Sequence, residues 1–282
     1  MILPPRIVLV RPKFSGNVGA SARAMGNTGL PDLRLVAPAD DPEAVHGDEH
    51  AAWSMAASGG DVLRAAIRHA SVAEAVAGCT VVIACTARPR AFKAWPNVGP
   101  EAAAELLCAA GRDGEPSALL FGPEDHGLST DDLEQATHLC QIPTGGVASS
   151  LNLAQSVLLL GWEWGKASRA LSRRPTPRAG RRPRADVAQV DGLAEQLGDL
   201  LERIDFFRRR GRQQSLVTLR QALLRGELTN VEVHFLRGLA RKLEWHLDHP
   251  GQLKAPAAPP ADGGGAPEPS DPPSDDEPSA KA

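Results

Sequence analysis

Three short segments of the chain combine glycines with polar side chains that can bind a phosphate or another charged ligand. The first segment, SGNVGASARAMG, places Gly16 and Gly19 on either side of Asn17, and Arg23 follows. Glycine lets the backbone approach a ligand closely, and a guanidinium can bind a phosphate through two parallel hydrogen bonds. The G-x-x-G spacing is not the G-x-G-x-x-G of dinucleotide sites, so an NAD site is disfavoured. A tight turn followed by a surface arginine is the alternative interpretation.

The second segment, FGPEDHGL, follows an apolar run and holds two acidic side chains between glycines. Gly122 comes directly after the run, Glu124 and Asp125 follow, and Gly127 comes near the end. Loops at strand ends often carry binding residues, although this pattern taken alone is also typical of a polar turn.

The third segment, GGVASSLNL, opens an otherwise apolar helix with three polar side chains, Ser149, Ser150 and Asn152. Buried polar groups need hydrogen-bonding partners, and capping of the helix start accounts for one serine. Capping by a serine does not account for Asn152, which favours a role for this asparagine in a binding site.

Apolar runs bounded by turn residues predict strands that alternate with helices, which is the pattern of an α/β protein with a mostly parallel sheet. The predicted strands are Arg6–Val10, Leu33–Ala37, Thr80–Cys85, Ala118–Phe121 and His138–Ile142. A helix from about Asn17 should end at Gly29, and a long helix should run from a cap at Ser149 or Ser150 to about Leu171. Because ligand sites form at strand ends in such sheets, the three segments predict one composite pocket.

The composition changes repeatedly after Leu171. Residues 172–188 are rich in proline and arginine, which predicts a linker. Residues 189–249 have a helical pattern, with Thr229 or Asn230 as the expected N-cap of the last helix. Residues 250–282 consist mainly of Pro, Gly, Ala, Ser and acidic side chains, which is typical of a disordered tail. We therefore expect a first domain over residues 1–171 and a small helical extension over residues 189–249.

The formal net charge of −3 argues against a nucleic-acid partner, but this value averages over segments of opposite charge. Residues 255–282 carry six acidic side chains and one basic one, whereas residues 166–184 carry eight basic side chains and no acidic one. This basic strip keeps an RNA partner open, because RNA phosphates require clustered Lys and Arg. Four cysteines without C-x-x-C spacing indicate buried thiols rather than a zinc site or disulfides. The apolar stretches are too short to cross a bilayer, so we expect no membrane contact and a cytoplasmic protein.

The order of GNVGASARAM, LLFGPEDHGL and IPTGGVASSLNLA resembles the motif order of the SpoU branch of the SPOUT RNA 2′-O-ribose methyltransferases. The resemblance covers Arg6 to about Leu171, and Asp191–His249 is similar to a C-terminal extension in that family. It implies a parallel sheet flanked by helices with a C-terminal trefoil knot, S-adenosylmethionine as the cofactor, and a homodimer with active sites at the subunit interface. The likeness is greatest to members that methylate cytidine or uridine at position 32 of the tRNA anticodon loop.

The resemblance also implies roles for particular residues. Arg23 matches the catalytic arginine of the family, with Asn17 and Ser150 as further catalytic residues and Glu124 as an interface residue. The implied cofactor-binding residues are Cys85, Thr86, Ala87, Gly122, Ile142, Ser149, Ser150, Leu151 and Asn152. The implied RNA contacts are Arg23, Arg88 and Arg90. No metal is required, since the sulfonium is already an activated methyl donor and the protein mainly aligns donor and acceptor. We expect Arg23 to position the target phosphate and hydroxyl, because a guanidinium is difficult to deprotonate.

Two other functions are compatible with parts of the sequence. His46, Glu49 and His50 form an H-x-x-E-H pattern, the order of inverted zinc-peptidase motifs, although no obvious third ligand follows. A non-catalytic RNA-binding protein with the same fold is the second alternative, and the retention of all three polar motifs argues against it. Pro123 and Ala148 stand where relatives often carry arginine and tyrosine, which leaves the base preference open.

Overall fold

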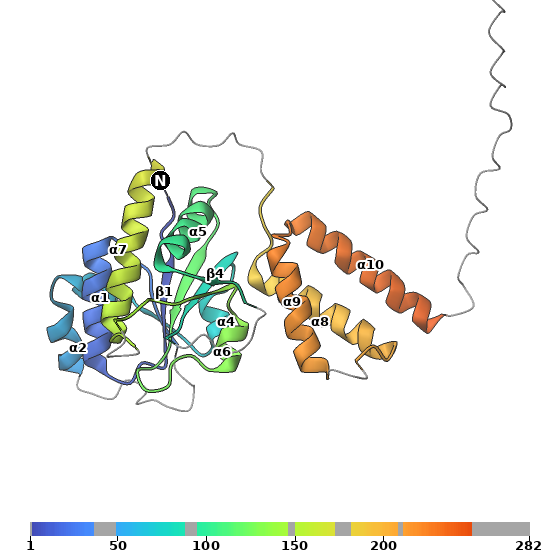
Figure 1. The fold of residues 1–282 in the computed structure, drawn as a ribbon, viewed down its shortest axis with the longest axis horizontal. Coiled ribbons are helices and arrows are strands. Elements are labelled where there is room, and N and C mark those ends of the chain that lie inside the picture. The colour runs from blue at the N-terminus through green and yellow to red at the C-terminus, as the bar shows by residue number, and fades with distance from the viewer. Residues whose placement is uncertain are drawn as a thin grey trace, which may run out of the picture. The chain divides into compact units, whose positions relative to one another are not determined.

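The structure is a computed structural model that describes residues 2–36, 49–87, 95–145, 150–172, 182–207 and 211–249, without the side chains of residues 49 and 50. Within these ranges seven strands form one sheet in the order β3-β2-β1-β6-β4-β7-β5. Figure 1 shows strands β1 and β4 of this sheet among the helices. The strands are β1 Arg6–Val10, β2 Leu33–Val36, β3 Ile67–His69, β4 Val81–Cys85, β5 Asn97–Val98, β6 Ser117–Phe121 and β7 His138–Cys140. Every strand pairing in this sheet is parallel, so the carboxyl ends of all strands lie at one edge.

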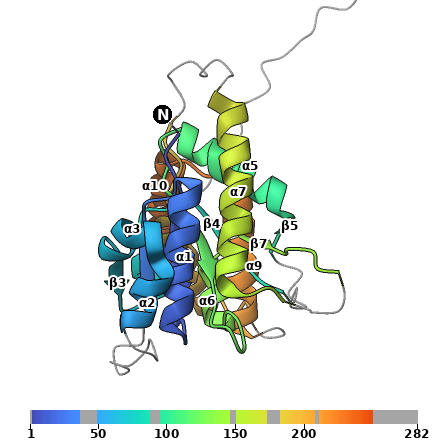
Figure 2. The same cartoon turned by 90° about the vertical axis from the view of Figure 1, so that its left-hand side faces the viewer.

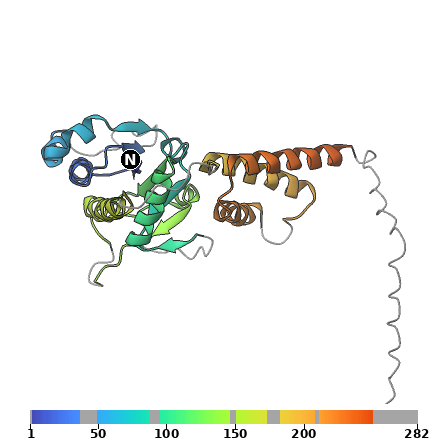
Figure 3. The ribbon, with the colours of Figure 1, turned by 90° about the horizontal axis from the view of Figure 1, so that it is seen from above.

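Helices cover both faces of the sheet, because successive residues of its strands are apolar on both sides. In β1, Ile7 and Leu9 belong to one buried cluster, whereas Val8 and Val10 belong to the other. The first cluster includes residues of α1, α5 and α7, and the second includes residues of α4 and α6. Figures 2 and 3 show α1 and α7 side by side with similar axis directions. The helices of this part of the chain are α1 Ser15–Thr28, α2 Glu49–Ala56, the 3₁₀ helix Ala57–Gly59, α3 Gly60–Arg64, α4 Val72–Ala75, α5 Pro100–Arg112, α6 Thr130–Glu134 and α7 Leu153–Ser172.

Gly19 serves helix packing rather than ligand contact. A Cβ atom at Gly19 would lie 1.9 Å from the carbonyl oxygen of Ala52 in α2, so only glycine permits this approach of α1 to α2. The expectation that both Gly16 and Gly19 admit a ligand is therefore wrong for Gly19.

Three further helices follow the basic segment: α8 Val187–Arg203, α9 Arg212–Arg225 and α10 Asn230–Asp248. Asp186 caps α8 in a capping box with Gln189. Thr229 caps α10, since its hydroxyl accepts a hydrogen bond from the Glu232 amide while the Glu232 carboxylate accepts one from the Thr229 amide. This confirms the N-cap prediction at Thr229. No helix among the described residues is long and apolar enough to cross a bilayer.

The parallel α/β sheet is confirmed, and each of the five predicted strands lies within two residues of its observed bounds. Gly29 is the C-cap of α1, with the left-handed φ of 75° that glycine tolerates, as predicted. Strands β3 and β5 are not predicted from the sequence. Both are short strands at the edges of the sheet, and Ile67 of β3 is exposed, so neither has the continuous apolar run of a central strand.

Candidate active site

A cavity of about 500 Å³ lies where the carboxyl ends of β4, β6 and β7 meet the starts of α1 and α7. All three sequence motifs contribute to its walls, which confirms that the segments form one composite pocket. Among the described residues, the walls include Asn17, Cys85, Thr86, Ala87, Gly122, Glu124, Ile142, Ser150, Leu151 and Asn152.

A chain of hydrogen bonds joins the three motifs at this cavity. The Asn152 Nδ2 donates to Asn17 Oδ1 at 3.1 Å, and the Asn17 Nδ2 donates to Glu124 Oε1 at 2.7 Å. The second carboxylate oxygen of Glu124 accepts the backbone N–H of Lys13 at 3.0 Å. Each asparagine amide is oriented by these contacts, because its oxygen and nitrogen have different partners.

Asn152 is also the cap of α7, so the prediction of a cap at Ser149 or Ser150 is wrong. The backbone N–H of Ala154 donates to Asn152 Oδ1 at 2.9 Å, and Gln155 Oε1 accepts the Asn152 N–H at 3.2 Å. The helix starts at Leu153, three residues after Ser150, and asparagine is among the best N-cap residues. The oxygen of Asn152 therefore fixes the helix start while its nitrogen holds Asn17.

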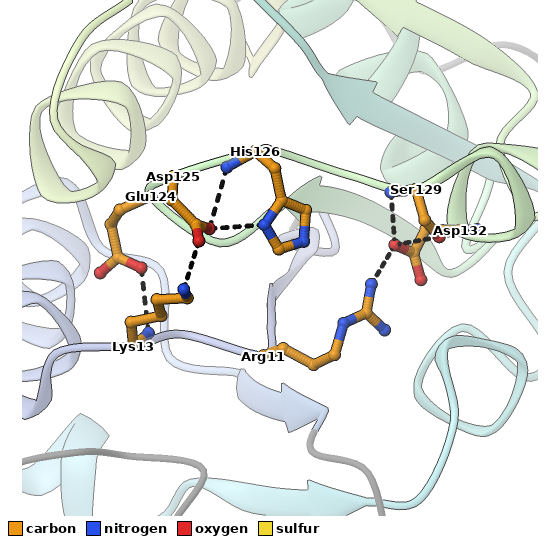
Figure 4. A network of polar contacts seen from close by, with 7 residues as sticks. All are labelled: Arg11, Lys13, Glu124, Asp125, His126, Ser129 and Asp132. Atoms are coloured by element: carbon orange, nitrogen blue, oxygen red, sulfur yellow. Dashed lines mark hydrogen bonds and ion pairs between the residues drawn. The ribbon is translucent and has the colours of Figure 1, made fainter.

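The GPEDHGL loop is a tight turn that needs its two glycines. A Cβ atom at Gly122 would lie 2.2 Å from the amide nitrogen of Leu128, and Gly127 has a left-handed φ of 71°. The Gly127 N–H donates to the Pro123 carbonyl at 2.9 Å. Figure 4 shows the acidic part of the loop facing the segment after β1, where Lys13 pairs with Asp125. The Asp125 carboxylate also contacts the His126 ring at 2.6 Å.

Arg23 is exposed on α1 and is absent from the described residues that line the cavity. Its Cα lies about 9 Å along the helix axis from that of Asn17, because six residues separate them. Ser149, Arg88 and Arg90 lie outside the described residues. The remaining residues expected at the site are brought together.

Sequence patterns did not single out several further residues of the cavity wall. Phe14 stands directly before the first motif, and His126 stands inside the second, so position next to a motif was the available signal. Thr144 stands directly before the third motif, and Ser156 lies three residues after its end.

The four cysteines are unpaired thiols, three buried and one, Cys85, partly buried at the cavity. Burial raises the pKa of Cys85 far above its ordinary range and raises the pKa of Cys140 to about 12, so both thiols are neutral at physiological pH. Among the described side chains, no three of His, Cys, Asp or Glu are placed to hold a metal ion. His46 and the side chains of Glu49 and His50, which form the H-x-x-E-H pattern, lie outside the described part.

Residues 4–162, which contain all three motifs, match the SpoU rRNA Methylase family, and the chain belongs to this family. It is 32% identical over 249 residues to the tRNA (cytidine/uridine-2′-O-)-methyltransferase TrmJ of Yersinia pestis, covering 87% of this chain and 93% of that relative. The TrmJ protein of Klebsiella pneumoniae is 33% identical over 243 residues, covering 85% and 96% of the two chains.

Two solved structures support the same assignment. The crystal structure of TrmJ from Z. mobilis aligns with a TM-score of 0.69 at 35% identity, covering 85% of this chain and 99% of that chain. A probable methylase family protein from Haemophilus influenzae aligns with a TM-score of 0.56 at 27% identity, covering 89% and 100%.

Proposed function

We propose that this protein is an S-adenosylmethionine-dependent RNA 2′-O-ribose methyltransferase that acts on cytidine or uridine at position 32 of the tRNA anticodon loop. The observation that carries the proposal is the hydrogen-bond chain from Asn152 through Asn17 to Glu124 beside the cavity. It connects one polar residue from each family motif. The names of the Yersinia and Klebsiella relatives support tRNA as the substrate.

The cavity fits S-adenosylmethionine in size and in lining. A volume of about 500 Å³ lies within the range of small-molecule cavities. Ile142, Leu151 and Leu153 offer apolar contacts to an adenine ring, and the carboxylate of Glu124 favours a cationic ligand nearby. Backbone groups of Cys85, Thr86, Ala87 and Gly122, with Ser149 and Ser150, would complete the cofactor site. When bound, S-adenosylmethionine supplies a methyl group already activated by its sulfonium.

The chain's own residues would align the acceptor nucleotide. Guanidinium groups are poor bases in proteins, so Arg23 would bind the phosphate beside the target ribose rather than accept a proton from it. Asn17, held by Glu124 and Asn152, and the nearby Ser150 would orient the 2′-hydroxyl. Alignment of this kind supplies a large part of the rate enhancement in transfers with activated donors.

We propose that the protein acts as a homodimer in which Arg23 serves the partner's cavity. The position of Arg23 outside the walls of its own cavity supports this arrangement. The side chains of Leu158 and Trp162 stand one helical turn apart on α7 and are 44% and 58% exposed. Such an apolar patch on the helix that starts at the cavity supports an interface there.

Three further features of the chain belong to this proposal. The position of β6 between β1 and β4, and the contact of α7 with both α1 and α5, support a C-terminal trefoil knot. Residues 1–171 would form the catalytic domain, residues 172–188 a basic linker, residues 189–249 the helical extension and residues 250–282 the acidic tail. Action on tRNA would place the protein in the cytoplasm.

Arg88 and Arg90 would add RNA contacts, together with part of the basic strip. Arg184 is already engaged by Glu115 and Glu227, and Lys166 by Glu163, so we expect neither of these two cations to bind phosphate. Exposed Arg182 is a better candidate.

Transfer of label from S-adenosylmethionine tests the proposal. Purified protein is incubated with tRNA and, separately, with ribosomal RNA, both lacking modification, and ribose methylation is mapped by nuclease resistance. We expect label on tRNA in the anticodon loop. Label on ribosomal RNA alone would reject the tRNA assignment, and no label on either RNA would favour a binding-only protein.

A further inference from the structure

The loop that carries Glu124 is tied to the segment after β1 by two ion pairs. One of them includes Asp125, which lines the cavity, and neither residue of the other lines it. Lys13 Nζ pairs with the Asp125 carboxylate, and Arg11 Nη2 pairs with the Asp132 carboxylate (Figure 4). Lys13 therefore contacts the loop twice, through its N–H to Glu124 and its ammonium to Asp125, and Arg11 contacts the loop at Asp132.

The Arg11 contact is the more buried of the two. The Asp132 side chain is 6% exposed, and its Oδ2 also accepts the N–H and the hydroxyl of Ser129, each at 2.7 Å. Asp132 thus closes the capping box that starts α6, which ends the loop. A buried carboxylate that loses its cationic partner becomes unfavourable, so without Arg11 the α6 start is expected to shift.

Arg11 itself has a strained backbone. Its φ is 46°, in the left-handed region that non-glycine residues rarely adopt. Its N–H donates to the Val36 carbonyl at 2.6 Å, which holds the chain in this turn directly after β1. The turn directs Lys13 toward Glu124, so the strain lies just before the first motif, in a segment that contacts the second motif.

We propose that Arg11 is a positioning residue for methyl transfer. Through Asp132 it holds the loop from Gly122 to Asp132, and thereby keeps Glu124 in place to orient Asn17. The inference rests on the proposed function, because Asn17 is assigned there to the acceptor hydroxyl. It adds a residue that lies outside the three motifs and does not line the cavity.

The test compares Arg11→Met with Arg11→Lys, and uses Arg34→Met as a matched control. Arg34 lies on β2 and forms a partly buried ion pair with Asp32 at 2.6 Å, in which the aspartate is more exposed than Asp132. Its guanidinium bonds to Asp32 and to the His69 ring, not to the loop. Three quantities are measured: the transfer rate at saturating S-adenosylmethionine and tRNA, the KM for tRNA, and the melting temperature.

Arg11→Met should lower the transfer rate by up to about 100-fold with little change in KM, the cost expected when reacting groups are displaced by about 1 Å. Arg11→Lys should recover most of the rate, because an ammonium can still pair with Asp132. Arg34→Met should lose stability but keep its rate. If the rates of both methionine variants instead follow their melting temperatures, Arg11 has only a structural role and the proposal is wrong.

Hydrogen exchange distinguishes a failure of the positioning role of Arg11 from a failure of the proposed function. Backbone amides of residues 122–132 should exchange faster in Arg11→Met than in the wild type. In Arg34→Met their exchange rates should equal those of the wild type. Equal exchange in all three proteins would overturn the positioning role even if the enzyme is active. A wild-type protein that methylates no RNA would reject the proposed function, while the exchange comparison would still report on the loop.

Discussion

Asn152 shows how one residue can serve both the fold and the site. Serine, asparagine and aspartate cap helices about equally well, so the sequence alone allows Ser149, Ser150 or Asn152 as the cap of α7. Only the backbone course shows that the helix starts at Leu153. The amide then has its oxygen for the helix and its nitrogen for Asn17. A carboxylate could only accept, and a serine hydroxyl would have to make both contacts through a single oxygen.

Because the oxygen and the nitrogen of the Asn152 amide have separate partners, two substitutions at Asn152 should differ in their effects on stability and on the methylation rate. Asn152→Asp keeps an oxygen for the Ala154 N–H but loses the donor to Asn17, so stability should be nearly unchanged while the methylation rate falls. Asn152→Ala loses both contacts and should also lower the free energy of unfolding by about 1 kcal/mol. Chemical unfolding and initial rates measure the two effects. Equal stability of the two variants would show that the cap is unimportant.

Gly122 is expected to tolerate no side chain. Because a Cβ would lie 2.2 Å from the Leu128 nitrogen, Gly122→Ala should displace the loop and cost about 1–3 kcal/mol of stability, with weaker S-adenosylmethionine binding. Calorimetric titration measures the affinity. Gly99→Ala is the control, since a Cβ there meets open space. An unchanged affinity in Gly122→Ala would mean that the loop does not contribute to the cofactor site.

At the scale of elements, the central strands were predictable because each is a continuous apolar run between turn residues. β1 and β6 are buried on both faces, and their sequences RIVLV and SALLF show it directly. β5 has only two residues, and the IRH sequence of β3 has one apolar side chain, which is exposed. Their pairing depends on neighbouring strands rather than on their own sequences, so no local pattern could predict them.

One buried ion pair predicts how this fold responds to acid. Burial alone would raise the pKa of Glu115, but hydrogen bonds and the charge of Arg184 lower it below its ordinary value of 4.5. On acidification the unfolded chain therefore takes up the proton first. The stabilisation is complete above about pH 4.5 and is lost as the pH falls through the lower pKa of the folded state.

We expect Glu115→Gln to lower the free energy of unfolding by about 2 kcal/mol at pH 7, the typical value of a hydrogen bond to a charged group. Urea unfolding at steps between pH 5 and pH 3 should then show a smaller acid-induced loss in the variant than in the wild type. Asp61→Asn, in an exposed pair with Arg64, serves as the control and should change little. Identical acid dependence in Glu115→Gln and wild type would contradict this role.

At the scale of the whole molecule, the order of the strands in the sheet could not be predicted from the sequence. β6 lies between β1 and β4, which come from far earlier in the chain, and this arrangement brings the motifs to one edge. The sequence could predict that the three motifs form one pocket, because ligand sites form at the ends of parallel strands. The hydrogen bonds between Asn152, Asn17 and Glu124 span more than a hundred residues and required the tertiary structure.

The proposed dimer makes a prediction at the same scale. Trp162→Glu or Leu158→Glu should weaken the dimer by about tenfold or more, because burying a carboxylate against apolar surface is costly. Analytical ultracentrifugation measures the dissociation, and Ile67→Glu, on the exposed edge strand, is the control. A wild-type protein that is monomeric and fully active would contradict the shared site.

The most direct test of the central claim is mass-spectrometric mapping of ribose methylation on one unmodified tRNA, with wild-type protein and with Arg23→Ala. We predict a single 2′-O-methyl group at position 32 with the wild type. Arg23→Ala should transfer none, although it should bind S-adenosylmethionine almost as tightly. Methylation only at another nucleotide would contradict the substrate assignment. Loss of cofactor affinity in Arg23→Ala would contradict the role of Arg23 as the residue that positions the acceptor.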